Sequence, residues 1–226
     1  MKIIATLALL LLCVFAAFAA QEDQRVRQAG QAMSEILSTP NGIPQNLLNR
    51  AACILVFPSV QKGAFGVRGS YGRGVLACRS GSRYAGSWGP PALYAFEGHG
   101  VKFPAGRNTA VILLVMNFEA ARSLLSGRVK LGPQVSIAPG PAAGTPEKAS
   151  PVTDAEILSY SRNRGMFTGI SLAGSTLRSD ANADQKLYGK KKLTAKEIIL
   201  DREVEIPACA KQLVSLLNSK SPSNPS

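Results

Sequence analysis

The most restrictive feature of this sequence is a glycine pattern that follows an apolar run. The run covers residues 53–57 (CILVF) and has the length and composition of a buried strand. Four glycines then recur at every third position from Gly63 to Gly72, and another follows at Gly74. The pattern is too short for a collagen helix, whereas glycine within strands indicates a bulge, a tight bend or a close backbone approach. We therefore expect residues 64–79 to form a strongly twisted hairpin.

Helical patterns lie on both sides of this region. Apolar residues at helical spacing predict an amphipathic helix over 23–38, with Arg25 on its polar side. Asn117 suits a helix N-cap, and Thr194 with Glu197 forms a capping box. The remaining predictions are a short helix at 44–51, helices at 118–126, at 195–203 and from Pro207 to about 217, and strands at 53–57 (ended by Pro58), 75–78, 92–96, 110–116, 157–161 and 166–172.

The order of these elements predicts the fold class. Helices lie at both ends and strands lie between them without regular alternation, which argues against a doubly wound fold. We expect an α+β fold with a mainly antiparallel, strongly twisted, glycine-rich sheet flanked by N- and C-terminal helices. The 226 residues suffice for a single domain with its own core. We place this domain at residues 20–218 and expect a disordered tail at 219–226.

The N-terminal segment has the character of a secretory signal peptide over residues 1–19. A basic start at Lys2 precedes an apolar run, and Ala17-Phe-Ala19 gives the small-residue pattern of a cleavage site. An uncleaved membrane anchor and lipidation at Cys13 are the alternatives. We expect an exported protein, periplasmic or extracellular, and leave open whether it attaches peripherally to a membrane.

Three cysteines remain once the leader is removed: Cys53, Cys78 and Cys209. Export permits disulfides, but an odd number allows at most one pair within the chain. Cys53 lies within the apolar run, and we interpret it as a small core residue. No particular pair is assigned.

Catalytic and cofactor motifs are missing from the sequence. It has no nucleophile elbow, phosphate loop or paired-cysteine zinc spacing. Glu97 and His99, the single histidine, could serve as acid and base of a hydrolase, but a surface loop is the simpler interpretation. Asp180 and Asp184 have too few neighbouring carboxylates for a calcium loop, and we expect a polar turn there. We expect a protein without enzymatic activity, cofactor or metal.

The charge pattern is more informative. The chain carries 26 basic and 14 acidic residues, and no Asp or Glu occurs between Ile36 and Phe96. Such a surface favours anionic partners, and arginine binds phosphate well. Export argues against nucleic acid, and the lysines of 186–192 are interpreted as a solvated turn. The acid-free stretch contains six cations: Arg50, Lys62, Arg68, Arg73, Arg79 and Arg83.

Several ordered blocks of the sequence resemble the SYLF domain, a lipid-binding and actin-regulating domain family. The first is residues 52–75 (ACILVFPSVQKGAFGVRGSYGRGV), and the similarity extends over about residues 25–218. Two positions depart from the family pattern, because Ala110 and Ala173 stand where acidic residues are expected. The other blocks are 88–92 (WGPPA), 113–117 (LLVMN), 131–141 (LGPQVSIAPGP) and 159–174 (SYSRNRGMFTGISLAG).

The resemblance implies binding to phosphoinositides or other anionic lipids and, in eukaryotic members, to actin. An exported protein favours the lipid over actin, so we expect peripheral binding of anionic phospholipid. A protein-interaction module of the actin-binding type, without lipid binding, is the alternative. From residue type, the expected lipid-binding surface comprises Lys62, Arg68, Arg73, Arg79 and Arg83, with Phe65 and Trp88 as interfacial anchors.

Overall fold

The computed structural model describes residues 21–39, 42–62, 69–81, 83–98, 109–132, 135–137, 156–163 and 166–224. The signal-peptide prediction for residues 1–19 lies outside these ranges, as does His99. None of the described helices combines the length and the apolar character that crossing a bilayer requires.

The centre of the molecule is one sheet with the strand order β5-β9-β3-β2-β1-β4-β7-β6, and β8 also pairs with β7. All pairings are antiparallel except that of β6 with β7. The strands are β1 (Cys53–Lys62), β2 (Ser70–Cys78), β3 (Ala92–Gly98), β4 (Thr109–Val115), β5 (Arg128–Lys130), β6 (Val135–Ile137), β7 (Ile157–Asn163), β8 (Met166–Gly169) and β9 (Thr176–Ser179).

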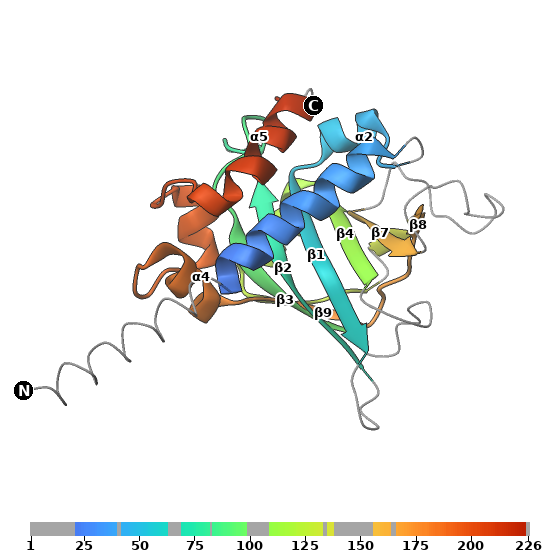
Figure 1. Cartoon of the computed structure of the whole chain (residues 1–226), viewed down its shortest axis with the longest axis horizontal. Coiled ribbons are helices and arrows are strands. Elements are labelled where there is room, and N and C mark those ends of the chain that lie inside the picture. Colours follow the sequence, from blue (N-terminus) through green and yellow to red (C-terminus); the bar gives the residue numbers. More distant parts are fainter. Residues whose placement is uncertain are drawn as a thin grey trace, which may run out of the picture.

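Helices flank the sheet at both ends of the chain. An N-terminal helix over residues 21–38 crosses the sheet diagonally, and the C-terminal helix lies on the same side (Figure 1). The α+β class, the mainly antiparallel sheet and the terminal helices are thus confirmed. The other helical elements are α2 (Gln45–Arg50), α3 (Phe118–Leu125), α4 (Ala181–Tyr188), a π-helical turn (Glu197–Asp201), a 3-10 turn (Ala208–Ala210) and α5 (Lys211–Lys220).

Successive strand residues point to opposite sides of a sheet, and helices bury both faces of its central strands. On one face, Ile54 and Val56 pack with the N-terminal helix, α2 and α5. On the other face, Leu55 and Phe57 pack with α3 and the π-helical turn. Residues 53–57 of β1 and 111–115 of β4 are therefore continuously apolar, because neither face of these strands contacts water.

Pro58 does not end the first strand, contrary to the sequence prediction. β1 continues to Lys62, and its register shifts near Pro58 against both neighbouring strands. A bulge accommodates proline because proline has no N–H to contribute to the ladder. Gly74 faces this bulge, where a Cβ would lie 2.3 Å from the Val56 carbonyl oxygen. The glycine pattern thus does mark a close backbone approach.

Two predicted irregular segments are ordered. The predicted polar turn around Asp180 and Asp184 is α4, which Asp180 caps by accepting a hydrogen bond from the Ala183 N–H. The predicted disordered tail is wrong for residues 219–224, because α5 extends to Lys220 and Ser221 is fully buried. Both expectations failed because these polar residues are held by partners distant in the sequence.

Both predicted helix caps form, and two of the three cysteines pair across neighbouring strands. Asn117 accepts the Ala120 N–H as predicted. The capping box at Thr194 forms in both directions with Glu197. Cys53 and Cys78, which are opposite each other in β1 and β2, form a disulfide, so Cys53 is not a free core thiol. Cys209 is free and buried.

Candidate functional site

The structure does not gather the predicted lipid-binding residues on one described surface. Phe65 and Arg68 lie outside the described residues, and Lys62 ends β1. Arg73 and Arg83 are exposed. Arg73 lies in the first half of β2, whereas Arg83 follows the end of that strand. Five residues, about 17 Å of strand, lie between Arg73 and the end of β2.

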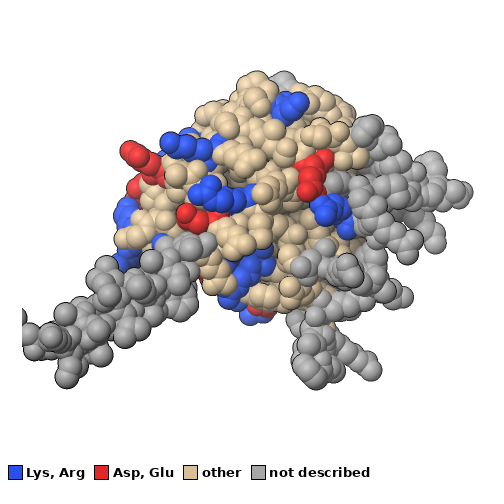
Figure 2. Space-filling view, viewed as in Figure 1, with Lys and Arg blue, Asp and Glu red and all other residues tan. Residues whose placement is uncertain are grey.

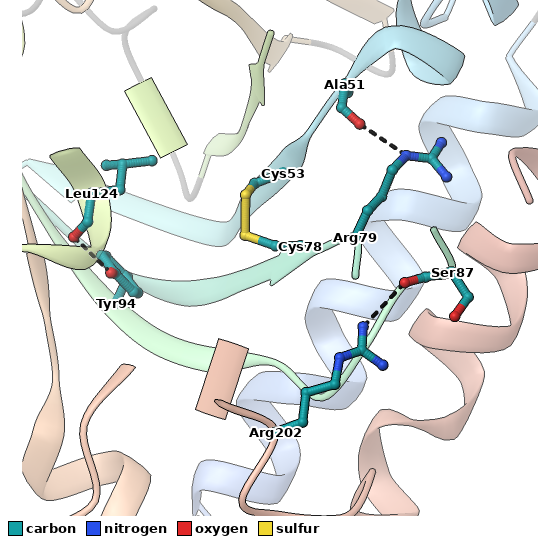
Figure 3. The surroundings of a disulfide bond; sticks show 8 residues. All are labelled: Ala51, Cys53, Cys78, Arg79, Ser87, Tyr94, Leu124 and Arg202. Atoms are coloured by element: carbon teal, nitrogen blue, oxygen red, sulfur yellow. Dashed lines mark hydrogen bonds between the residues drawn. A yellow bond between two sulfur atoms is a disulfide. The ribbon is translucent and has the colours of Figure 1, made fainter. Parts of the chain in front are cut away.

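Arg79 and Trp88 are buried, so their assignment to a solvent-facing surface is corrected. Each is 1% exposed, and the Arg79 guanidinium lies 4.4 Å from the centre of the Trp88 ring. The Arg79 Nε donates to the Ala51 carbonyl at 3.0 Å, beside the Cys53–Cys78 disulfide (Figure 3). Burial lowers the pKa of Arg79 to about 10.

The C-terminal segment closes the pocket around Arg79. The Ser221 carbonyl accepts from Arg79 Nη1 and from Trp88 Nε1, both at 2.9 Å. The Ser221 hydroxyl also contacts Arg79 Nη2 and bonds to Asn49. No carboxylate neutralises this arginine within the described residues, so carbonyl and hydroxyl oxygens and an aromatic face stabilise its charge. Other residues of the chain thus contact every part of the guanidinium. We call the surroundings formed by Asn49, Ala51, Trp88 and Ser221 the Arg79 pocket.

A cavity of about 510 Å³ lies between the N-terminal helix and the β1–β2 hairpin. The helix contributes Arg25 and a row of glutamines, and β1 contributes Ser59 and Gln61. β2 contributes Tyr71 and Arg73, both exposed, and the Arg73 Nε donates to the Tyr71 hydroxyl at 2.9 Å. This hydrogen bond raises the pKa of Arg73. We call this space the helix–hairpin cavity.

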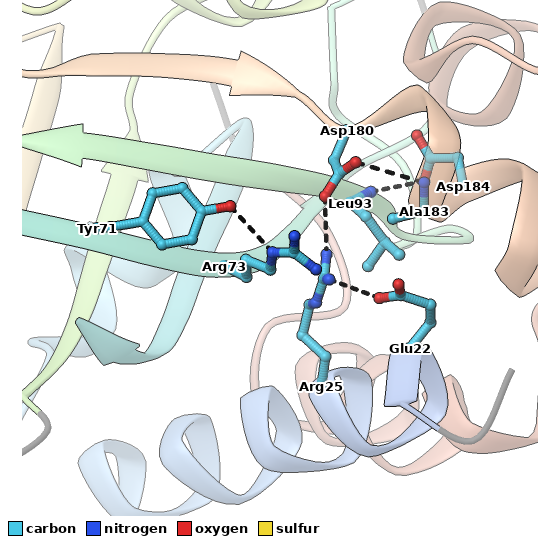
Figure 4. A network of polar contacts seen from close by, with 8 residues as sticks. All are labelled: Glu22, Arg25, Tyr71, Arg73, Leu93, Asp180, Ala183 and Asp184. Atoms are coloured by element: carbon cyan, nitrogen blue, oxygen red, sulfur yellow. Dashed lines mark hydrogen bonds and ion pairs between the residues drawn. The ribbon is translucent and has the colours of Figure 1, made fainter. Parts of the chain in front are cut away.

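Arg25 belongs to a buried ion network at one end of the cavity (Figure 4). The sequence placed Arg25 on the polar side of its helix, but it is only 5% exposed. It lies 2.6 Å from a Glu22 carboxylate oxygen and 3.4 Å from one of Asp180. Two carboxylates therefore neutralise this guanidinium, which explains how a cation can be buried here.

Asp184 lies behind this network and is fully buried. Its Oδ1 accepts the Leu93 N–H at 2.7 Å, whereas its Oδ2 has no hydrogen-bond partner among the described residues. Burial raises the pKa of Asp184 to about 8, and the negative charge of Asp180 acts in the same direction. A protonated Asp184 would connect α4 to β3 at neutral pH.

The suggested acid and base pair is not assembled in the described residues. Glu97 accepts from Arg178 Nε at 2.8 Å and from Arg128 Nη2 at 3.1 Å, so it holds β3, β5 and β9 together. His99 lies outside the described ranges. Within those ranges, no three His, Cys, Asp or Glu residues are placed to hold a metal ion.

A second exposed cationic region follows α4. Lys190, Lys191, Lys192 and Lys196 are exposed, and Leu200 on the π-helical turn is 44% exposed. Lys190 pairs with Glu203 at 2.6 Å. We call Lys191, Lys192, Lys196 and Leu200 the lysine surface. Figure 2 shows the Lys and Arg side chains of one face of the molecule scattered rather than gathered in one patch.

Sequence reasoning missed the residues that matter most around these sites. Ser221 and Asn49 meet in the Arg79 pocket although 172 residues separate them in the sequence, and no local pattern links them. Gln24 and Gln28 line the helix–hairpin cavity. Their spacing of four residues puts them on one side of the helix, and this was the one available signal.

Comparison with known proteins places the chain in a family. Residues 97–220 match the family described as Ysc84, Las17-binding protein actin regulator. The chain is 32% identical over 191 residues to an SH3 domain-containing protein of Schizosaccharomyces pombe, covering 82% of this chain and 43% of the relative. It is 28% identical over 192 residues to protein YSC84 of Saccharomyces cerevisiae, covering 83% of this chain and 40% of that one.

The similarity extends to vertebrates. The SH3 domain-containing YSC84-like protein 1 of Xenopus laevis is 30% identical over 202 residues, covering 85% of this chain and 59% of the relative. The chain thus spans about half the length of the curated relatives it matches. No solved structure matches the chain. The chain belongs to the Ysc84 family, the SYLF domain family that its sequence blocks resemble.

Proposed function

We propose that this chain is a non-enzymatic module that binds a protein partner with an acidic surface. Membership of a family described as Las17-binding actin regulators carries the proposal. The charge of the chain supports it, because 26 basic residues face only 14 acidic ones. A positive surface accelerates and orients encounters with acidic partners.

The lysine surface has the composition of a contact region. Lys191, Lys192 and Lys196 have no ion-pair partner among the described residues, so their charges are available to a partner. Leu200 adds an exposed apolar side chain four residues after Lys196. An apolar centre within a charged margin is the usual arrangement of a protein interface.

Filamentous actin is the first partner to test, because the family description names actin regulation. Residues 20–226 would be sedimented with actin filaments at low and physiological salt. We expect the chain to pellet with the filaments and to bind more weakly as salt screens the charges.

A matched pair of variants locates the surface. Lys191→Gln with Lys196→Gln should weaken binding about three- to tenfold, because each exposed ion pair contributes about 0.2–1 kcal/mol. Arg122→Gln with Lys130→Gln removes the same charge from α3 and β5 and should leave binding unchanged. Equal losses in both variants would exclude the lysine surface as the contact.

Peripheral binding to anionic phospholipid is the second candidate function. The pairing of an exposed aromatic ring with an arginine favours it, because Tyr71 is 40% exposed and Arg73 lies beside it. Tyrosine suits the interface of a membrane and arginine suits phosphate. The Arg68 and Phe65 predictions remain part of this candidate.

Vesicle sedimentation separates this candidate from the first. Vesicles of phosphatidylserine and phosphatidylcholine would be compared with vesicles of phosphatidylcholine alone. Lipid binding predicts pelleting with the anionic vesicles only, with a loss in the Tyr71→Ala, Arg73→Gln variant. Pelleting with both kinds of vesicle, or with neither, would contradict it.

Export is part of the same proposal. The signal-like residues 1–19 direct it, and the buried Cys53–Cys78 disulfide supports it, because disulfides persist in oxidising compartments. The acidic partner that the chain meets would then lie in the cell envelope or outside the cell, and the actin filaments of the sedimentation test stand in for it as an acidic protein surface. Fractionation of cells expressing the full chain, with blotting for the shortened mature form, tests this.

A further inference from the structure

The helix–hairpin cavity is lined by exposed side-chain amides that no other described residue binds. Gln21, Gln24 and Gln28 line it from the N-terminal helix, and Gln61 lines it from β1. None of these four amides has a hydrogen-bond partner in the part of the chain that the structure describes. Each can donate two hydrogen bonds and accept others. The lining therefore offers a dense set of neutral donors and acceptors.

Two further groups add to this set. The Ser59 hydroxyl oxygen is buried and has no hydrogen-bond partner among the described residues, although Ser59 lines the cavity. A buried polar group without a partner costs free energy, which a ligand that bonds to it would recover. Tyr71 is 40% exposed on the same lining and presents an aromatic ring. Such a ring supplies an apolar face beside a polar handle.

The cations around the cavity are mostly neutralised already. Arg25 is held by Glu22 and Asp180. Arg162, which lines an adjoining hollow, pairs with Glu35. Arg73 bonds to the neutral Tyr71 hydroxyl and is the one lining arginine without a carboxylate among the described residues. A ligand with several phosphate groups would need several free cations, so the described lining of the cavity does not suit a polyanion.

The space itself is elongated. A hollow of about 230 Å³ adjoins the main cavity of about 510 Å³, and both are lined by Gln28, Pro58 and Ser59. The larger volume alone lies within the range of about 300–1,000 Å³ found for small-molecule sites. The two together follow the N-terminal helix, so a chain of several small rings could extend along them.

We propose that the helix–hairpin cavity binds a neutral or singly charged, hydroxyl-rich ligand, a short oligosaccharide. Hydroxyl groups both donate and accept hydrogen bonds, and free glutamine amides and the Ser59 hydroxyl match them in both directions. The Tyr71 ring would stack against the apolar face of a sugar ring, and Arg73 would bind a single acidic group where the sugar carries one. The site is separate from the lysine surface.

Nuclear magnetic resonance on ¹⁵N-labelled residues 20–226 tests the proposal. The probes are the neutral trisaccharides cellotriose, maltotriose and chitotriose, with inositol hexakisphosphate as a polyanion. We expect at least one trisaccharide to shift the side-chain amide signals of Gln24 and Gln28 with a dissociation constant in the millimolar range or below. Inositol hexakisphosphate should leave these two signals in place.

Three variants assign the effect to the cavity. Gln24→Ala with Gln28→Ala should weaken trisaccharide binding about tenfold, and Tyr71→Ala about three- to tenfold. Gln212→Ala changes an exposed glutamine of α5, outside the cavity, and should have no effect. Alanine favours helix, so the paired substitution preserves the N-terminal helix, and the backbone spectrum reports its folding.

Two results would overturn the proposal. If none of the three trisaccharides shifts Gln24 or Gln28 at millimolar concentration, the cavity is not a sugar site. If inositol hexakisphosphate shifts these signals more strongly than every sugar, the cavity binds anions instead. Either result is independent of whether the chain binds actin through the lysine surface.

Discussion

The Arg79 pocket and the helix–hairpin cavity both place arginines from one stretch of chain beside an aromatic ring. In the Arg79 pocket, the chain fills every position: Ser221, Asn49 and Ala51 bind the guanidinium and Trp88 covers it. In the helix–hairpin cavity, Arg73 bonds to Tyr71 and the neighbouring amides stay free. The two regions contain similar residue types. They differ in how many of the polar groups have hydrogen-bond partners within the chain.

This difference indicates that the Arg79 pocket stabilises the fold and that the helix–hairpin cavity is available for binding. A buried polar cluster that the chain satisfies holds the fold together, and changing it should cost stability. The exposed polar lining of the helix–hairpin cavity contributes little to folding and stays available to a ligand. The following predictions test whether the two regions divide in this way.

Arg79→Ala should have the largest effect on stability. It leaves buried carbonyl oxygens without donors and removes the contact with Trp88, so we expect the free energy of unfolding to fall by about 3–5 kcal/mol. Urea unfolding followed by circular dichroism measures it. Arg79→Lys keeps the charge with fewer hydrogen-bond donors, so its free energy of unfolding should lie between those of the wild type and Arg79→Ala. An Arg79→Ala variant as stable as the wild type would show that the pocket is dispensable.

Removal of the last residues should have the next largest effect. A chain that ends at Lys220 lacks Ser221, whose carbonyl serves both Arg79 and Trp88, and should lose about 2 kcal/mol. A chain that ends at Pro222 keeps Ser221 and serves as the control. Thermal unfolding of the two compares them directly, and equal midpoints would mean that the segment is not part of the fold.

Asp184 should make stability depend on pH. Its pKa is raised to about 8 in the folded protein, so the folded state holds a proton that the unfolded state releases near pH 4. This group therefore favours folding most at low pH, and that contribution is lost as pH rises from about 4 to about 8.

The Asp184→Asn variant isolates this contribution, because asparagine can still accept the Leu93 N–H and does not titrate. The wild type should lose at least about 1 kcal/mol relative to this variant between about pH 5 and pH 8. Urea unfolding at several pH values gives the difference. Parallel pH curves for the two proteins would mean that Asp184 is ionised throughout.

Arg73→Ala should have the smallest effect on stability. Arg73 is exposed, and it donates a hydrogen bond to an exposed tyrosine, so the free energy of unfolding should change by less than about 0.5 kcal/mol. The same urea titration measures it beside Arg79→Ala. If Arg73→Ala lowered the free energy of unfolding as much as Arg79→Ala does, the two regions would not differ in their contribution to stability.

Local patterns sufficed for much of the fold. The amphipathic period revealed the N-terminal helix, and the caps at Asn117 and Thr194 were readable because their partners lie three residues away. Pro58 misled because proline usually ends strands, and only pairing on both sides shows that a bulge accommodates it. α4 was missed because its stability depends on Arg25 and Leu93, far away in the sequence.

The sites were less accessible to sequence reasoning. Arg79 and Arg73 occur in the same glycine-rich, acid-free stretch and looked equivalent. Their burial differs because α5 and Ser221 return to cover one of them, a contact 142 residues away. The sequence also left the disulfide pairing unassigned, because the pairing of Cys53 with Cys78 depends on the register of β1 against β2.

Sedimentation of residues 20–226 with actin filaments and with anionic vesicles, side by side in one buffer, tests the central claim most directly. We expect the chain to pellet with the filaments and salt to weaken this binding. Lys191→Gln with Lys196→Gln should reduce it, whereas a folded Arg79→Lys variant should bind as the wild type does. A folded chain that stays in the supernatant with the filaments at every salt concentration would contradict the claim.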